Sequence, residues 1–525
     1  MVVRCSHRYR YVSSKGAILT LIWNALVCSF FVASTFDLLL SRVPYSQYVN
    51  AAIHAVNTIF FYPLAGWLAD VYFGRYRVIR VSIWIMWVGM LLVAVCLGVE
   101  YLISNTSKVG EDVIRFGIFP LVYLLENIGL AGFQPNIVPF GIDQFQGLPS
   151  AEITAYVHWF VLTMYASKFV FLNPLNCINS DLFYTLMALI CVACLSIAIS
   201  SDFLFRNHFI IEPESRNPLK IIFQVLKYAL ENKHPKKRSA LSFCDDEKPS
   251  RIDFGKSKYG GPFSTEQVED VKTCLRILAF LVVMNFFFIA AYGPQNAKPY
   301  LIRHLFSSGS CYEKGFLTNL RIYCNVAFIV VHELFVYPIL CNHMPSILKR
   351  FGFAIVLFLL SNFFQFGIDI AGHLQVHTAN VTLPCMFAAH KSVQTLPIDY
   401  RWIVGSEVLS GIANVYVNIS VFELVCAQAP YSMKGLLIGL IYSLNGLCSA
   451  INGVFPLLFA QIKPTKGRQF LTCGFAFYLT NTVILLVGIA IFSALAKWYK
   501  LRKRDERPYD HRYVEEYYNK YRATS

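Results

Sequence analysis

The stretch VIRVSIWIMWVGMLLVAVCLGV, residues 78–99, decides the fold. It carries a single charged residue, Arg80, and a helix that rises about 1.5 Å per residue would cross the roughly 30 Å of hydrocarbon in a bilayer over this length. Similar apolar runs recur along the chain, near 17–40, 46–69, 115–137, 155–177, 181–205, 274–294, 318–341, 351–372, 402–428, 435–461 and 470–497. The sequence therefore predicts an all-α polytopic membrane protein with 12 transmembrane helices.

Composition and charge agree with this prediction. Of 525 residues, 56% are hydrophobic and 15% charged, and the net charge is +15. That charge would suit nucleic acid, but Lys and Arg gather in alternate connections: the N-terminal arm, the loop with Arg75 and Arg77, the central loop and the tail after Lys497. The positive-inside rule then places both termini in the cytoplasm, although the basic loop at 463–468 goes against it. The expected partner is the lipid bilayer, and no nucleic acid is expected.

Two glycosylation sequons give a separate check on the topology. Asn105 (N-T-S) and Asn380 (N-V-T) both fall in loops that the topology places outside, so both are expected to carry glycans. Most of the 15 cysteines lie inside apolar runs, where a free thiol acts as a small hydrophobic group. Cys311 and Cys385 both fall outside, and the sequence leaves open whether they pair.

No cofactor and no metal site are predicted. His373 and His377 have the i, i+4 spacing of metal ligands, but no third ligand accompanies them in the sequence. The G-x-S-x-G, P-loop and H-E-x-x-H motifs are missing, so the chain is not expected to be an enzyme.

The apolar runs divide into six, a long polar connection and six more. The predicted organisation is a cytoplasmic N-terminal arm (1–16), an N-terminal six-helix bundle (17–205), a cytoplasmic linker (206–272), a C-terminal six-helix bundle (273–498) and a cytoplasmic tail (499–525). Within the linker, residues 217–232 repeat apolar side chains at helical spacing, which predicts an amphipathic helix on the membrane surface. A 6+6 plan suits two bundles that rock about a site near the bilayer midplane.

The loop after the second apolar run reads GWLADVYFGRYRVIR at 66–80 and resembles the major facilitator motif G-x-L-A-D-x-x-G-R. Charges at a membrane boundary can form a breakable latch between helix ends, which alternating access requires. The resemblance implies a cytoplasmic latch formed by Asp70, Gly74 and Arg75, and the alternative is a simple topological anchor.

A second motif narrows the resemblance. The stretch GLAGFQPNIVPFGIDQF at 129–145 resembles the F-G-x-D-Q-F signature of the proton-dependent oligopeptide transporter family, and stretches at 268–272, 333–340 and 406–435 agree with it. The form of the motif at 63–70 and the stretch at 261–272 are most similar to the peptide/histidine transporter branch. This resemblance implies the major facilitator fold, with two six-helix bundles.

The resemblance fails at the residues that couple proton movement to peptide binding. The family carries E-x-x-E-R followed by F-x-Y-Y in its first span, whereas residues 24–33 read NALVCSFFVA, and Gln134 stands where the family has a lysine. An unpaired lysine that faced missing carboxylates would be costly in a low-dielectric interior, so the two losses fit each other. Transport is then either facilitative or driven through Glu423, Glu407 or Glu126.

The resemblance also implies a binding site. Glu423 matches the family acid that faces a peptide amino terminus, and Gln134, Asn136 and Tyr165 would offer polar contacts to the solute. Lys298 and Glu333 align with the family's outer gate pair.

Two charges have no counterpart in the family pattern. Glu126 and Lys168 fall near the middle of neighbouring antiparallel spans, and we interpret them as a relocated ion pair. The alternative is two unrelated residues.

Two functions follow from these patterns. The first is a solute carrier for small peptides or histidine-like amino acids that works by alternating access; the second is a non-transporting membrane receptor or scaffold derived from such a carrier. The groups that are kept at 298, 333 and 423 favour the carrier, since a scaffold has no reason to bury charges. The predicted location is the plasma or an endolysosomal membrane, and the sequence does not identify the solute, its direction or the oligomeric state.

Overall fold

The structure is a computed structural model that describes residues 11–34, 47–103, 118–145, 150–175, 181–211, 217–234, 249–305, 311–340, 343–378, 402–460, 462 and 473–499. Asn105, Asn380 and Cys385 lie outside these residues, as do the side chains of Lys168, Lys298 and Cys311. The described part of the chain is helical and contains no β-strand.

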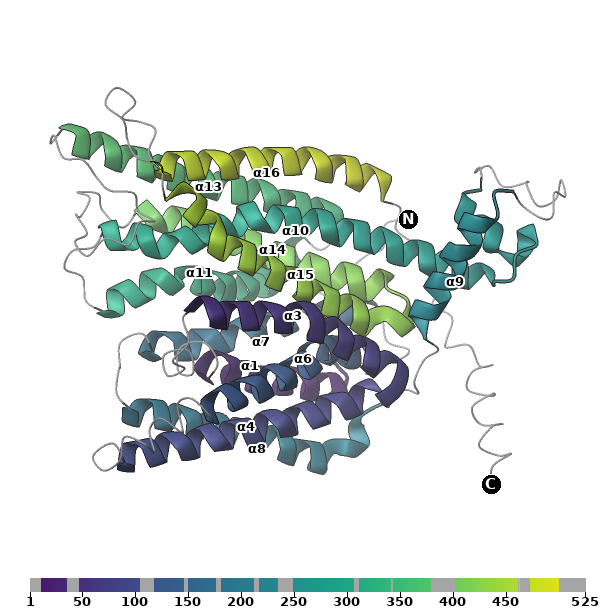
Figure 1. Cartoon of the computed structure of the whole chain (residues 1–525), viewed down its shortest axis with the longest axis horizontal. Helices are drawn as coiled ribbons and strands as arrows, with labels where there is room; N and C mark the ends of the chain where they lie inside the picture. Colours follow the sequence, from purple (N-terminus) through teal and green to yellow (C-terminus); the bar gives the residue numbers. More distant parts are fainter. Residues whose placement is uncertain are drawn as a thin grey trace.

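Six helices form the N-terminal bundle, drawn in purple to blue in Figure 1. They are α1 (Lys15–Ser34), α3 (Gln47–Leu68), α4 (Arg75–Ile103), α6 (Phe119–Asp143), α7 (Ser150–Leu175) and α8 (Asp181–Phe205). A short π-helical turn, η1 (Ala69–Phe73), continues α3. Helix α4 packs against α6 and α8, and α1 packs against α7 and α8.

The C-terminal bundle repeats this plan, in teal to yellow in Figure 1. Its helices are α10 (Thr265–Leu305), α11 (Cys311–Val331), α13 (Ile347–Thr378), α14 (Trp402–Gln428), α15 (Lys434–Val454) and α16 (Cys473–Trp498). The π-helical turn η7 (His332–Val336) and α12 (Tyr337–Leu340) prolong α11. Eight helices in the described residues are long and apolar enough to cross a membrane. Because α1, α3, α6 and α7 complete the two sets of six, the predicted fold class is confirmed.

The linker forms its own small layer at one end of the bundles, which we call the linker end; the opposite end is the far end (Figure 1). Helix α9 (Pro218–Glu231) starts at Asn217, whose side chain accepts a hydrogen bond from the amide of Leu219 at 3.1 Å. Val225 on α9 is buried with Val268 and Val271 of α10, so part of its apolar face packs against protein. The exposed Phe223 still leaves an apolar edge, and the membrane-surface location stays a prediction.

A charge cluster ties the linker to α10, which begins earlier than the apolar run suggested. Asp253 contacts Lys256 and Lys272, each at 2.7 Å. Burial alone raises the pKa of this carboxyl, but the hydrogen bonds from Lys256, Lys272 and Ser250 outweigh that effect and hold the pKa well below its ordinary value. These contacts explain why α10 extends back to Thr265, inside the predicted linker.

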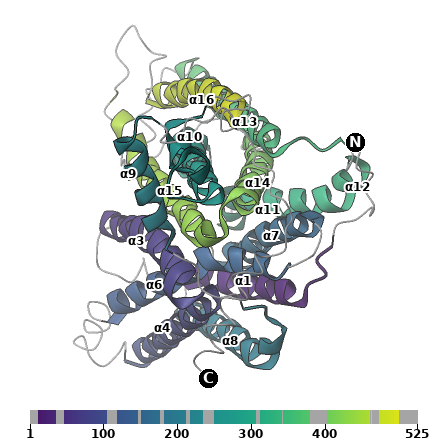
Figure 2. The same cartoon turned by 90° about the vertical axis from the view of Figure 1, so that its right-hand side faces the viewer.

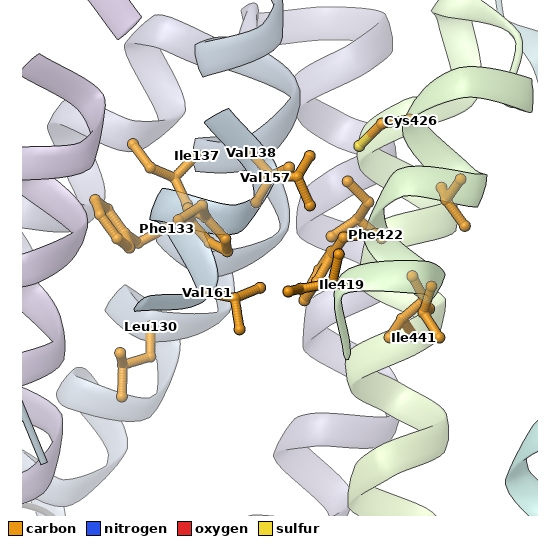
Figure 3. Packing of buried hydrophobic residues seen from close by; sticks show 14 of the residues in the cluster. Leu130, Phe133, Ile137, Val138, Val157, Val161, Ile419, Phe422, Cys426 and Ile441 are labelled. Carbon is orange, nitrogen blue, oxygen red and sulfur yellow. The ribbon is translucent and has the colours of Figure 1, made fainter. Parts of the chain in front are cut away.

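The two bundles meet along four helix pairs. Figure 2, which views the linker end, places α3 beside α15 and α7 beside α11 and α14, and α15 also contacts α6. Apolar side chains fill this interface. Figure 3 shows Val157 and Val161 of α7 facing Ile419 and Phe422 of α14, and the ring of Phe422 lies 5.7 Å from that of Phe160. Each bundle therefore presents an apolar surface to the other near the linker end.

Candidate functional site

The predicted latch residues meet at the linker end. Arg75 donates hydrogen bonds to Asp70 at 2.8 Å and to Asp143 at 2.6 Å, and all three side chains are buried. The turn between α3 and α4 needs Gly74, whose φ of 78° lies in the left-handed region that side chains avoid. A guanidinium held by two carboxylates is a pre-organised ion cluster.

The same cluster reaches into the other bundle. Arg75 also donates to the backbone carbonyl of Tyr431 at 2.8 Å, and its guanidinium lies 4.7 Å from the ring of Tyr431. Asp70 accepts hydrogen bonds from the amides of Gly435 at 2.9 Å and Leu436 at 3.2 Å, at the N-terminus of α15. A helix N-terminus favours an anion, so one bundle caps a helix of the other and holds the linker end closed.

Helices α3 and α15 approach each other through glycine. A Cβ atom on Gly439 would lie 2.5 Å from the carbonyl oxygen of Tyr62 and 2.8 Å from Cα of Pro63. A Cβ atom on Gly446 would meet the side chain of Thr58 at 2.6 Å. Close backbone approach of this kind is a common way to pack helices in membranes.

A polar network joins the bundles farther from the linker end. The hydroxyl of Tyr165 on α7 accepts hydrogen bonds from Asn414 at 2.8 Å and from Asn418 at 3.0 Å, both on α14. The hydroxyl of Tyr292 on α10 donates to Asn414, and Arg321 of α11 lies 5.5 Å from the Tyr292 ring. We call these five residues the central network. Four helices from the two bundles contribute to it.

Arg321 differs from the other members of the central network. One guanidinium nitrogen, Nη1, is buried and has no hydrogen-bond partner among the described residues. A buried cationic nitrogen in this state costs more than a neutral one, so the position favours an anionic partner. Arg321 was not predicted from the sequence, because nothing local distinguishes it from a residue at a helix boundary.

The other predicted binding residues lie apart from this network. Glu423 forms an ion pair with Arg350 at 2.8 Å, toward the linker end of α14. Asn136 is buried beside Gly435, where its carboxamide oxygen would lie 3.0 Å from a Cβ atom. Gln134 is half-buried on α6. Of the four predicted binding residues, only Tyr165 belongs to the central network.

The structure does not bring the predicted gate residues together. Lys298 lies close to the far end of α10, whereas Glu333 lies in η7 close to the linker end. At about 1.5 Å per residue, their backbones differ in depth by on the order of 20 Å, which no side chain spans. The resemblance aligned Lys298 and Glu333 with the family's gate residues by their place in the sequence, and that alignment does not give their depth in the bundle.

Glu126 and Lys168 lie at similar depth on α6 and α7. The Glu126 carboxylate is fully buried, and neither oxygen has a hydrogen-bond partner in the part of the chain that the structure describes. Its Cγ atom would be 3.3 Å from a Cβ atom on Gly89 of α4.

A third cluster lies between the bundles and was not predicted. His158 of α7 and the adjacent pair His332 and Glu333 of η7 bring three potential ligand atoms within 4.8 Å of one another. The sequence predicted no metal site, because His158 is far in the chain from the adjacent His332 and Glu333 and the three have no ligand spacing.

Two helical bundles, an ion cluster at one end and a polar network between them are the architecture of a membrane transporter. The PTR2 model, described as the POT family, matches residues 76–470. The chain therefore belongs to the POT family, whose members are multi-pass transporters of peptides or related solutes and not enzymes.

Individual relatives agree. The chain is 23% identical over 440 residues to mouse "Solute carrier family 15 member 3", covering 75% of this chain and 74% of that protein. It is 22% identical over 566 residues to "Protein NRT1/ PTR FAMILY 2.11" of Arabidopsis thaliana, covering 94% and 87%. The crystal structure of the POT family transporter PepTSo superimposes with a TM-score of 0.58 at 17% identity, covering 92% of this chain and 98% of that one. This likeness confirms the major facilitator fold.

Proposed function

We propose that this POT-family transporter carries a small solute with a carboxylate group, such as a peptide or an amino-acid-like molecule, by alternating access. The linker end is the cytoplasmic end in this proposal, and the membrane is the plasma or an endolysosomal membrane. The observation that supports it is Arg321, a cation whose buried Nη1 has no hydrogen-bond partner in the described residues.

The surroundings of Arg321 suit recognition of a carboxylate. Arg321, Tyr165, Asn414 and Tyr292 lie at similar depth, roughly 15–20 Å from the far ends of their helices at the α-helical rise. A guanidinium binds a carboxylate with two parallel hydrogen bonds, and neighbouring Tyr and Asn side chains can accept or donate the rest. Because the network includes both bundles, a solute bound there would respond to their relative movement.

Glu423 would bind the ammonium group of the solute, provided that its ion pair with Arg350 breaks. Its carboxylate is bonded to Arg350 in this conformation, so the ammonium would have to compete with a guanidinium. Gln134 and Asn136 remain proposed contacts for other conformations of the carrier. If transport is driven by protons, the candidate groups remain Glu423, Glu407 and Glu126.

The first prediction concerns Arg321→Gln. In vesicles that hold the purified protein, the variant should take up a labelled dipeptide roughly 10- to 100-fold more slowly at subsaturating concentration, because it loses a charge-assisted hydrogen bond. The wild type should prefer a dipeptide with a free carboxyl terminus over its C-terminal amide, and the variant should lose that preference. Arg276→Gln, a half-buried arginine at the linker end of α10, is the matched control and should retain it.

Unchanged discrimination in Arg321→Gln would contradict the proposed carboxylate site. Uptake of neither dipeptide nor histidine by the wild type, at matched pH and with an inward acid gradient, would favour the alternative of a non-transporting receptor. Uptake that the gradient stimulates would show that proton coupling survives without the acids of the family's first span.

The second prediction concerns the proposed pair of Glu126 and Lys168. Glu126→Lys and Lys168→Glu should each lower the thermal unfolding midpoint, since each leaves two like charges at one depth in a low-dielectric interior. The double charge swap should restore most of the loss, while Glu126→Gln serves as a neutral comparison. A double swap no more stable than the worse single variant would show that the two residues are unrelated.

A further inference from the structure

His158, His332 and Glu333 are buried at the interface between the bundles. Their exposed fractions are 1%, 3% and 6%. His158 belongs to α7 of the N-terminal bundle, and the other two belong to η7 of the C-terminal bundle. Any group that binds all three therefore links the bundles near the linker end.

The two distances from the histidine nitrogens to Glu333 fit a small cation. Nε2 of His158 lies 3.5 Å from Oε1 of Glu333, and Nδ1 of His332 lies 3.0 Å from the same oxygen. Two ligand atoms of a tetrahedral zinc ion, each roughly 2.0–2.1 Å from the metal, lie about 3.3 Å apart. Both distances are close to that value, and imidazole and carboxylate are ligands that zinc accepts.

The tautomer of His158 also favours metal binding. Its Nδ1 lies 2.8 Å from the backbone carbonyl of Thr154, which can only accept, so this nitrogen carries the proton. In the neutral ring, Nε2 then presents a lone pair toward Glu333. Metal-bound histidines commonly donate their other N–H to a backbone carbonyl in this way.

Protonation of both histidines would not stabilise the cluster. The two imidazole rings lie 5.4 Å apart and nearly parallel, so charging both would place two cations side by side. One divalent ion shared by both rings and the carboxylate avoids that repulsion.

From this geometry we propose that His158, His332 and Glu333 form a binding site for a divalent ion of the zinc class, which links the two bundles and stabilises the closed linker end. Glu333 supplies the anionic ligand, whereas the nearby acid of α14, Glu423, is paired with Arg350. The ion reaches the site when the linker end opens, and its binding holds the carrier in the conformation described above.

Zinc chloride added to the purified, EDTA-washed full-length protein tests the site. Zinc at micromolar concentration should raise the thermal unfolding midpoint, followed by tryptophan fluorescence, by about 3 °C or more. Magnesium at the same concentration should not, because it prefers oxygen ligands. His158→Gln and Glu333→Gln should each weaken the zinc response at least about tenfold in midpoint concentration, whereas His343→Gln, an exposed histidine at the linker end, should respond as the wild type does.

The wild type alone gives a second measurement that does not depend on variants that fold. X-ray absorption at the zinc edge should show one ion per chain with two imidazole ligands. An equal response to magnesium, a zinc response unchanged in His158→Gln, or a spectrum without imidazole would each overturn the proposal. These readouts do not require transport, so they distinguish failure of this site from failure of the proposed carboxylate site.

Discussion

Replacing Arg75 with alanine is expected to open the linker end and to abolish transport. The substitution leaves Asp70 and Asp143 buried without the guanidinium that both contact. Removing one partner of a buried ion pair costs on the order of 3–5 kcal/mol, which corresponds to a shift of roughly 10²- to 4 × 10³-fold against the closed conformation. The same change also removes the hydrogen bond to Tyr431 in the other bundle.

Hydrogen exchange measures this opening directly. The amides of Gly435 and Leu436 donate to Asp70 across the interface, so a peptide spanning 431–440 should exchange faster in Arg75→Ala. Arg77→Ala removes the same charge from an exposed position two residues further along α4 and should exchange as the wild type does. Equal exchange in both variants would contradict a latch.

A further variant separates latching from folding. In Arg75→Ala combined with Asp70→Asn and Asp143→Asn, no buried carboxylate is left uncompensated. This triple variant should regain thermal stability and still fail to transport, because the cap on α15 is weakened and the cation is gone. Recovery of transport in the triple variant would show that the cluster serves stability only.

The sequence predicted what is local. The transmembrane helices follow from the length of the apolar runs. Asp70, Gly74 and Arg75 lie in a single sequence motif, at the turn between α3 and α4. Asp143 lies in the quoted stretch 129–145 but was not assigned to the latch, although a charged residue at the end of an apolar run was a usable signal. Its contact with Arg75 joins residues of different helices, which the spacing in one motif does not encode.

Contacts between bundles depend on depth and helix rotation, and these were not predictable from the patterns. A shift of one residue turns a helical side chain by about 100°, so Asn414 and Arg321 gave no sign that they join Tyr165 and Tyr292. Depth also separates Lys298 from Glu333, which the resemblance had paired. The actual neighbours of Glu333, His158 and His332, come from a different helix and from the preceding residue.

Leucine at Gly439 is expected to prevent closure of the linker end. A Cβ atom there would lie 2.5 Å from a backbone oxygen of α3 and 2.8 Å from a backbone Cα, so no neighbouring side chain can turn away to make room. Helices α3 and α15 must therefore separate. Overpacking commonly costs about 1–3 kcal/mol, and contact with backbone places this site at the upper limit, which is roughly 100-fold in the balance between closed and open.

Gly453 supplies the matched control for this change. It lies on the same helix, and a Cβ atom added to it meets no heavy atom within 4 Å. Gly453→Leu should keep wild-type uptake and wild-type exchange at 431–440, while Gly439→Leu should lose at least about tenfold in uptake and exchange faster there. Both variants should unfold at similar temperatures, because each bundle keeps its own core when α3 and α15 part. If Gly439→Leu transports at the wild-type rate, the close approach of α3 and α15 is not a step that the transport cycle requires.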